Sequence, residues 1–154
     1  MSKPSARKPT VVSSGYETSI KRTVIAALLV VLGIAWMAIY YTVARDAALA
    51  LPGQKVSNPI PFMADLEKWN YLIGFGLIFL GLAVSAHKTT PLGRGRGVVI
   101  GMLGCFLIGL VWIVTFYFAG QDGPIPVMKD LDQYNLLVGI GFMAVGFTFA
   151  TKWE

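Results

Sequence analysis

Charge, cysteine and histidine are all scarce in this sequence. Charged residues make up 14% of its 154 residues, against about 25% in an ordinary soluble domain. The single cysteine, Cys105, excludes an intramolecular disulfide and a cysteine-based metal cluster. The sequence also has no Ser/His/Asp set, no HExxH motif and no phosphate-binding loop. We therefore expect no enzyme and no cofactor or metal site.

Long stretches of the chain have no charge at all. Four of them hold 18 to 25 residues each, at 23–44, 69–86, 97–121 and 133–151. A helix crosses the bilayer core, about 30 Å thick, with roughly 20 apolar residues. The sequence therefore predicts an all-α integral membrane protein with four transmembrane helices, at about 23–44, 66–86, 98–119 and 131–151.

A cleaved signal peptide is the competing interpretation of the first stretch. That stretch is longer than an apolar signal core of about 7–15 residues. In addition, Arg45 and Asp46 come before the small residues that would form the cleavage site, 48–50. A membrane-spanning helix is the better interpretation.

The distribution of Lys and Arg predicts the orientation, because these residues mark the cytoplasmic side. The tail 1–22 has five basic residues and one acidic residue, and the connection after the second stretch has three basic residues and no acid. We expect a plasma-membrane protein with both termini cytoplasmic, a disordered basic tail (1–22), a basic linker (89–97) and outer loops at 45–65 and 120–130. The tail is either a topology signal alone or also a site for anionic lipids. No nucleic-acid motif accompanies these charges.

A repeat explains the order of these helices. "PIPFMADLEKWN" (59–70) returns as "PIPVMKDLDQYN" (124–135), and the match extends to residues 59–88 against 124–153 with 11 identities. The first and third stretches also align, at "LGIAWMAIYYTVA" (32–44) and "IGLVWIVTFYFAG" (108–120). The unit is a helix, an outer loop and a helix, and it occurs twice in the same orientation, at 23–88 and 98–154. We expect two parallel helical hairpins in one bundle, which a two-fold axis along the membrane normal could relate.

The repeated phrase supplies candidate site residues near the start of each second helix. Asp65 and Asp130 are predicted N-caps. Trp69 and Tyr134 are predicted to lie at headgroup depth, where amphipathic rings settle. An asparagine follows in both copies, able to bond a loop or a neighbouring helix. These asparagines are Asn70 and Asn135. The start of a helix explains most of this pattern, and a shared role in recognition of a partner is the alternative.

The apolar stretches add glycines and tryptophans to the candidates. Glycines seven residues apart share one helix face and allow close packing of helices. We expect intramolecular packing, with contact to a second protein as the alternative. Trp36 and Trp112 occupy the same position in the two units and either anchor at the interface or line a contact surface. The glycines are Gly74, Gly81, Gly139 and Gly146.

The second unit resembles the CrgA family of actinobacterial cell-division membrane proteins. The resemblance rests on Gly109–Trp112, on a brief outer loop, on the Tyr134-Asn135 step and on the basic-Trp ending, Lys152-Trp153. It covers residues 98–153 well and 21–88 more loosely. The family pattern has one hairpin, whereas this chain has two, and its first unit lacks the basic-Trp ending.

The resemblance implies a non-enzymatic membrane adaptor that is enriched at the division septum. Its implied partners are the septal peptidoglycan transpeptidase and the tubulin-like division GTPase, with the binding surface expected in the second unit. A small transporter or channel subunit is one alternative, although charge-free helices count against it. A lipid-organising protein is another, and pairing of two chains stays open.

Overall fold

The computed structural model describes residues 17–119 and 122–152. Most of the predicted tail (1–16) and Trp153 lie outside the described residues. The end of the predicted tail is helical, because α1 begins at Ile20. The hydroxyl of Ser19 accepts a hydrogen bond from the amide of Arg22 there, as an N-cap residue does.

All regular secondary structure in the described part of the chain is helical. The first helix runs without a break through a π-helical segment, so Ile20–Ala48 forms one rod of 29 residues. This rod and α5 are long and apolar enough to cross a membrane, whereas α4 and α7 are shorter apolar helices. The elements are α1 (Ile20–Ile39), η1 (Tyr40–Ala44), α2 (Arg45–Ala48), α3 (Pro61–Asp65), α4 (Trp69–Ser85), α5 (Arg96–Ala119), α6 (Pro126–Leu131) and α7 (Tyr134–Ala150).

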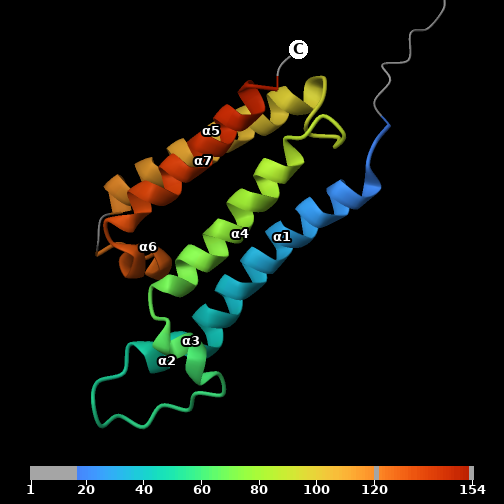
Figure 1. Cartoon of the computed structure of the whole chain (residues 1–154). Helices are drawn as coiled ribbons and strands as arrows, with labels where there is room; N and C mark the ends of the chain where they lie inside the picture. Colours follow the sequence, from blue (N-terminus) through green and yellow to red (C-terminus); the bar gives the residue numbers. More distant parts are fainter. Residues whose placement is uncertain (1–16, 120–121, 153–154) are drawn as a thin grey trace, which may run out of the picture.

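The long helices form two hairpins that lie side by side (Figure 1). Helix α1 packs along α4, α5 packs along α7, and the hairpins meet mainly through α4 and α7. We call the end with α2, α3 and α6 the loop end. The opposite end, with the start of α1, the α4–α5 connection and the end of α7, is the terminal end.

Glycines set the closest approach of the helices in both hairpins. A Cβ atom at Gly33 would lie 2.5 Å from the carbonyl oxygen of Gly74, and one at Gly109 would lie 2.6 Å from that of Gly139. A Cβ atom at Gly81 would come within 2.8 Å of the Ala26 carbonyl oxygen. Within each hairpin the two long helices therefore cross at repeat-equivalent glycines. Any side chain at these positions would push the backbones apart.

The second helices start later than predicted, and the physical reason is the same in both copies. Pro61 and Pro126 lie in the first turns of α3 and α6. A backbone N–H has no helical partner there, so its absence in proline costs nothing, and the φ angle of proline suits a helix. The prolines therefore start short helices, which the sequence analysis did not foresee. Left-handed residues then separate these from α4 and α7, with φ of 43° at Glu67 and 46° at Asp132.

The prediction of Asp65 and Asp130 as N-caps is consequently wrong. Asp65 ends α3, and Asp130 lies inside α6. The residues before α4 and α7 are Lys68 and Gln133, and neither makes a side-chain capping hydrogen bond.

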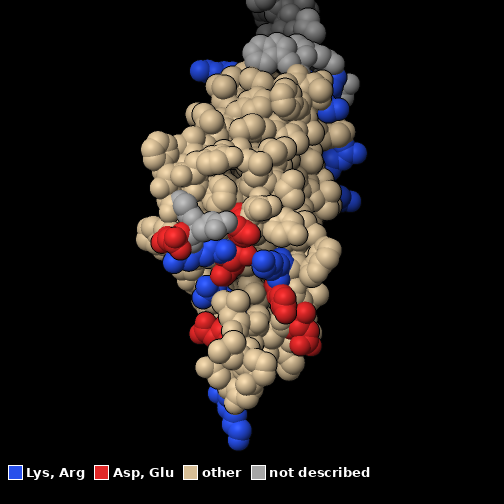
Figure 2. Space-filling model, turned by 90° about the vertical axis from the view of Figure 1, so that its left-hand side faces the viewer, with Lys and Arg blue, Asp and Glu red and all other residues tan. Residues whose placement is uncertain are grey.

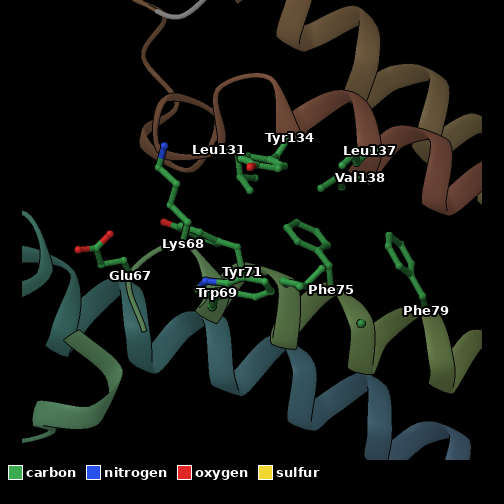
Figure 3. Close-up of a pocket in the computed structure, with 12 residues that line it drawn as sticks. Glu67, Lys68, Trp69, Tyr71, Phe75, Phe79, Leu131, Tyr134, Leu137 and Val138 are labelled. Atoms are coloured by element: carbon green, nitrogen blue, oxygen red, sulfur yellow. The ribbon is translucent and has the colours of Figure 1, made fainter. Parts of the chain in front are cut away.

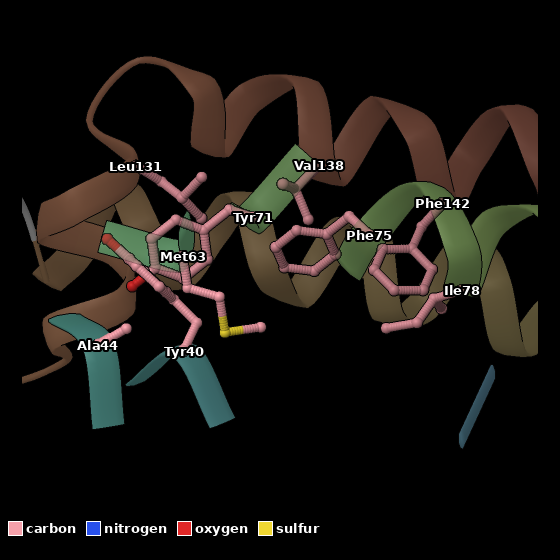
Figure 4. Packing of buried hydrophobic residues seen from close by; sticks show 9 residues of the cluster. All are labelled: Tyr40, Ala44, Met63, Tyr71, Phe75, Ile78, Leu131, Val138 and Phe142. Atoms are coloured by element: carbon pink, nitrogen blue, oxygen red, sulfur yellow. The ribbon is translucent and has the colours of Figure 1, made fainter. Parts of the chain in front are cut away.

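One aromatic cluster joins the hairpins near the loop end (Figure 4). The rings of Tyr40 and Tyr71 meet edge to face at 5.2 Å within the first hairpin. Between the hairpins, Phe79 meets Phe142 edge to face at 5.0 Å. Such aromatic pairs stabilise by about 0.5–1.5 kcal/mol beyond the area they bury.

The two hairpins contact each other through residues that are not equivalent in the repeat. The contact therefore lacks the two-fold symmetry that the repeat would allow. Helix α4 buries Tyr71 and Phe75, but their repeat counterparts in α7 are Leu136 and Ile140, which are 38% and 49% exposed. Helix α7 instead buries a different face, which includes Val138. The contact is therefore heterologous, with each copy contributing its own surface.

Candidate functional site

Each asparagine of the repeated phrase holds a short helix against the long helix that follows it. The Nδ2 atom of Asn70 donates to the carbonyl oxygens of Met63 (2.6 Å) and Glu67 (3.0 Å). The Nδ2 atom of Asn135 donates to the equivalent carbonyl oxygens in the second unit, at 2.7 and 2.8 Å. Both asparagines are 0% exposed. Their amides thus add a second hydrogen bond to carbonyl groups of this region, since the Met128, Glu67 and Asp132 carbonyls also accept a backbone N–H.

The asparagine and the equivalent tryptophan of each unit also carry unpaired polar atoms. The Oδ1 atoms of Asn70 and Asn135 and the indole Nε1 atoms of Trp36 and Trp112 are buried without a hydrogen bond to another described residue. Buried polar groups are normally paired, so a repeated exception marks a position under an unusual constraint. The Trp112 ring meets Phe75 of the other hairpin at 5.5 Å, whereas Trp36 meets Phe62 of its own hairpin at 6.2 Å.

A charged cluster crosses between the hairpins at the loop end. Arg45 binds the Asp130 carboxylate through Nε (2.6 Å) and Nη2 (2.9 Å), and the Tyr71 hydroxyl donates to the same carboxylate at 2.8 Å. Burial alone would raise the pKa of Asp130, but the hydrogen bonds from Arg45 and Tyr71 outweigh it, and the pKa lies below its ordinary value. The cluster fixes α6, which is the counterpart of α3 in the second unit, to the first hairpin.

The sequence analysis missed Arg45 as a site residue. Its signal was present, because Arg45 is the first charge after a 22-residue apolar stretch. The repeat alignment places Gln121 at the equivalent position of the second unit, so the pairing could not be inferred from the repeat.

An apolar groove of about 540 Å³ lies between α4 and α7 near the loop end (Figure 3). Phe75 and Phe79 point into it from α4, and Trp69 and Tyr134 stand at its mouth. These two mouth residues are 65% and 55% exposed. The groove extends over Gly76, at which an added Cβ atom would meet nothing within 4 Å.

The repeat-equivalent glycines Gly76 and Gly141 have different surroundings. On α7, the Phe79 ring covers Gly141, whose added Cβ atom would lie 2.5 Å from it. The repeat counterparts of these two residues are Ala144 and Gly76. Gly76 lines the groove, whereas Gly141 is covered by the Phe79 ring.

The structure separates the predicted site residues into three groups. The glycines, Gly74, Gly81, Gly139 and Gly146, face neighbouring helices. The asparagines are buried within their units, and Trp36 and Trp112 are half-buried. Asp65, Trp69 and Tyr134 are exposed, and Asp130 is bound to Arg45. Among the described residues, no group of three His, Cys, Asp or Glu side chains is placed to hold a metal ion.

Fold and site together define a class of protein: a small apolar helical protein built from two copies of one hairpin. The model of the family described as "Cell division protein CrgA" matches this chain twice, over residues 1–88 and 86–154. The chain therefore belongs to the CrgA family of cell division proteins. The two matched segments also fit the predicted tandem duplication.

Individual relatives agree with this assignment. A cell division protein CrgA from Streptomyces avermitilis is 48% identical over 63 residues, which cover 41% of this chain and 71% of the relative. CrgA proteins from Corynebacterium aurimucosum and Corynebacterium glutamicum are 34% and 37% identical, and the alignments cover 80% and 79% of the relatives. They cover 46% and 54% of this chain. No solved structure matches the chain.

Proposed function

We propose that this protein is a non-enzymatic adaptor of the cell-division machinery that crosses the plasma membrane four times, with both termini in the cytoplasm. The observation that carries the proposal is the duplication of a CrgA unit as two apolar hairpins of the same internal geometry. Because the hairpins pack directly on each other, one chain presents two units at a fixed spacing, as an adaptor needs.

The charge pattern supports the four-span arrangement. Basic residues lie at the terminal end, whereas both acidic and basic residues lie at the loop end. Figure 2 shows a broad surface without charged residues between these two zones. All four long helices run through this apolar zone, and the excess of Lys and Arg at the terminal end is the cytoplasmic signature. Helices α4 and α7 have 17 residues each, at the short end of the spanning range of roughly 17–25 residues.

The groove mouth is the surface that we assign to a division partner on the outer side of the membrane. Trp69 and Tyr134 are exposed large aromatics, the kind of residue that anchors protein interfaces. The buried Asn70 and Asn135 act behind them by fixing the starts of α4 and α7. By family resemblance, the partners are the septal transpeptidase and the tubulin-like GTPase. The groove mouth lies on the outer side and is assigned to the transpeptidase, whereas the GTPase can reach only the terminal end, on the cytoplasmic side.

Imaging of dividing cells tests this proposal. A fluorescent protein fused to the N-terminus and expressed at the native level should give a sharp band at the septum. Tyr134→Ala should weaken that band several-fold at an unchanged protein level. Tyr117→Ala removes an exposed tyrosine (69%) from α5 that does not line the groove, and it should leave the band intact. A uniform membrane signal that is unchanged at septa would refute the division role, and an equal effect of both variants would refute the assigned surface.

A further inference from the structure

Three segments of the chain bring basic groups together at the terminal end. Arg22 comes from the first turn of α1, His87 and Lys88 follow α4, and Lys152 follows α7. The Nη1 atom of Arg22 lies 2.7 Å from Nδ1 and 2.6 Å from Nε2 of His87, and 3.4 Å from the hydroxyl of Thr89. Arg22 and His87 belong to the first hairpin, and the charge of Lys152 from the second hairpin also acts on the His87 ring.

The connection that carries this cluster is held firmly in place. The hydroxyl of Thr90, which is 1% exposed, donates to the carbonyl oxygens of Ser85 and His87. The amide of Ser19 donates to the carbonyl oxygen of Thr89 at 2.8 Å, which fastens the connection to the start of α1. The exposed His87 and half-buried Thr89 side chains are therefore positioned by a buried scaffold, so little conformational entropy is lost when they bind a ligand.

The cluster has an excess of positive charge around the His87 ring. Partial desolvation and the charges of Arg22, Lys152 and Lys88 lower the pKa of His87. These charges disfavour the protonated form of the ring, and the Arg22 guanidinium lies directly beside it. An anion placed here would gain donors from Arg22, Thr89 and lysine, and would favour protonation of the ring as a further donor.

We infer that Arg22, His87, Thr89 and Lys152 form a binding site for the phosphate group of an anionic phospholipid. Arginine and lysine with a hydroxyl donor are the groups that bind phosphate. The position favours a lipid as the source, because the cluster lies where the apolar lengths of α1, α4 and α7 end. The inference rests on the proposed membrane placement and gives the duplicated chain a lipid contact that both hairpins share.

The single histidine permits a direct test by solid-state NMR. Full-length protein with 15N-labelled histidine is placed in bilayers of phosphatidylcholine alone or mixed with phosphatidylglycerol. Dephasing of the ring nitrogens by lipid 31P reports a phosphate in contact with His87, since no other histidine contributes. We expect dephasing in the mixed bilayer and its loss in Arg22→Gln and in Lys152→Gln. Lys55→Gln, at the loop end, is the matched control and should behave like the wild type.

The pH titration of the same ring separates a bound phosphate from a general surface charge. The His87 pKa should rise by about one unit on adding phosphatidylglycerol. That rise should shrink severalfold in Lys152→Gln, whereas surface potential alone would give an equal rise in both proteins. Dephasing of equal size in phosphatidylcholine, or an equal pKa rise with inorganic phosphate, would overturn the assignment to an anionic lipid. Absence of dephasing in protein that floats with the bilayers would overturn the site while leaving the proposed membrane placement intact.

Discussion

Asp65 and Asp130 occupy the same place in the two copies of the repeat, yet their environments differ completely. Asp65 is exposed and has no hydrogen bond or ion pair to another described residue, whereas Asp130 receives bonds from Arg45 and Tyr71 of the other hairpin. Two identical residues in one repeat thus have different energetic roles. The difference arises because only the first unit supplies an arginine and a tyrosine at the loop end.

The first prediction follows from this difference. Asp130→Asn should lower the free energy of unfolding by about 1.5–3 kcal/mol, the usual contribution of hydrogen bonds to charged groups, because Arg45 would lose its partner. Thermal unfolding in detergent micelles, followed by circular dichroism, measures the effect. Asp65→Asn is the matched control and should change nothing beyond experimental error.

The pH dependence of this effect has a fixed sign. The folded pKa of Asp130 lies below its unfolded value of about 3.9. Its contribution is therefore complete above that value and is lost as the pH falls through the folded pKa. The difference between wild type and Asp130→Asn should vanish in strong acid, and a difference that persisted there would rule out the ion pair as its source.

At the scale of elements, the crossing of α1 with α4 and of α5 with α7 depends on glycine at the point where backbones touch. Gly33 and Gly109 each face a backbone carbonyl oxygen, which cannot move aside as a flexible side chain can. Gly104, near the middle of α5, has nothing within 4 Å of an added Cβ atom. Glycines of the same helix therefore divide into packing positions and free positions.

The second prediction uses that division. Gly109→Ala should destabilise the protein by about 1–3 kcal/mol, as overpacking does. Gly104→Ala should be neutral or stabilise by about 0.5–1 kcal/mol, because alanine is the better helix former. Urea or detergent-titrated unfolding of the two variants gives the comparison. Equal effects would show that the Gly109–Gly139 contact does not limit the approach of the helices.

At the scale of the whole molecule, the two units associate through unlike faces and the Arg45–Asp130 pair crosses between them. A heterologous contact fixes one order of the hairpins, because exchanging them would place Leu136 and Ile140 where Tyr71 and Phe75 now lie. The chain is therefore a single body with distinct first and second halves.

The third prediction concerns the orientation of this body in the membrane. In a Cys105→Ala background, Ser57→Cys at the loop end should react with a membrane-impermeant maleimide on intact cells. Arg94→Cys at the terminal end should react only after lysis, because the excess of basic residues there resists translocation. The reverse pattern would place the termini outside and contradict the proposed topology.

The sequence by itself determined the helical class, the apolar hairpins and their duplication, because these follow from charge-free length and from repeated local phrases. It also indicated the packing glycines, since small residues seven apart share a helix face. It misassigned Asp65 and Asp130, because Pro61 and Pro126 start short helices that precede the expected caps. Local rules favoured an N-cap, but the helix boundary lies three residues further on.

Only the tertiary structure decided how the copies differ. The repeat predicts equivalent environments for equivalent residues, but the contact between the hairpins is made of residues that the copies do not share, such as Arg45, Tyr71 and Phe79. Which faces meet depends on the summed packing of all four long helices, and no local pattern in the chain encodes that sum. The groove over Gly76 and the ion pair at Asp130 both result from that asymmetric packing.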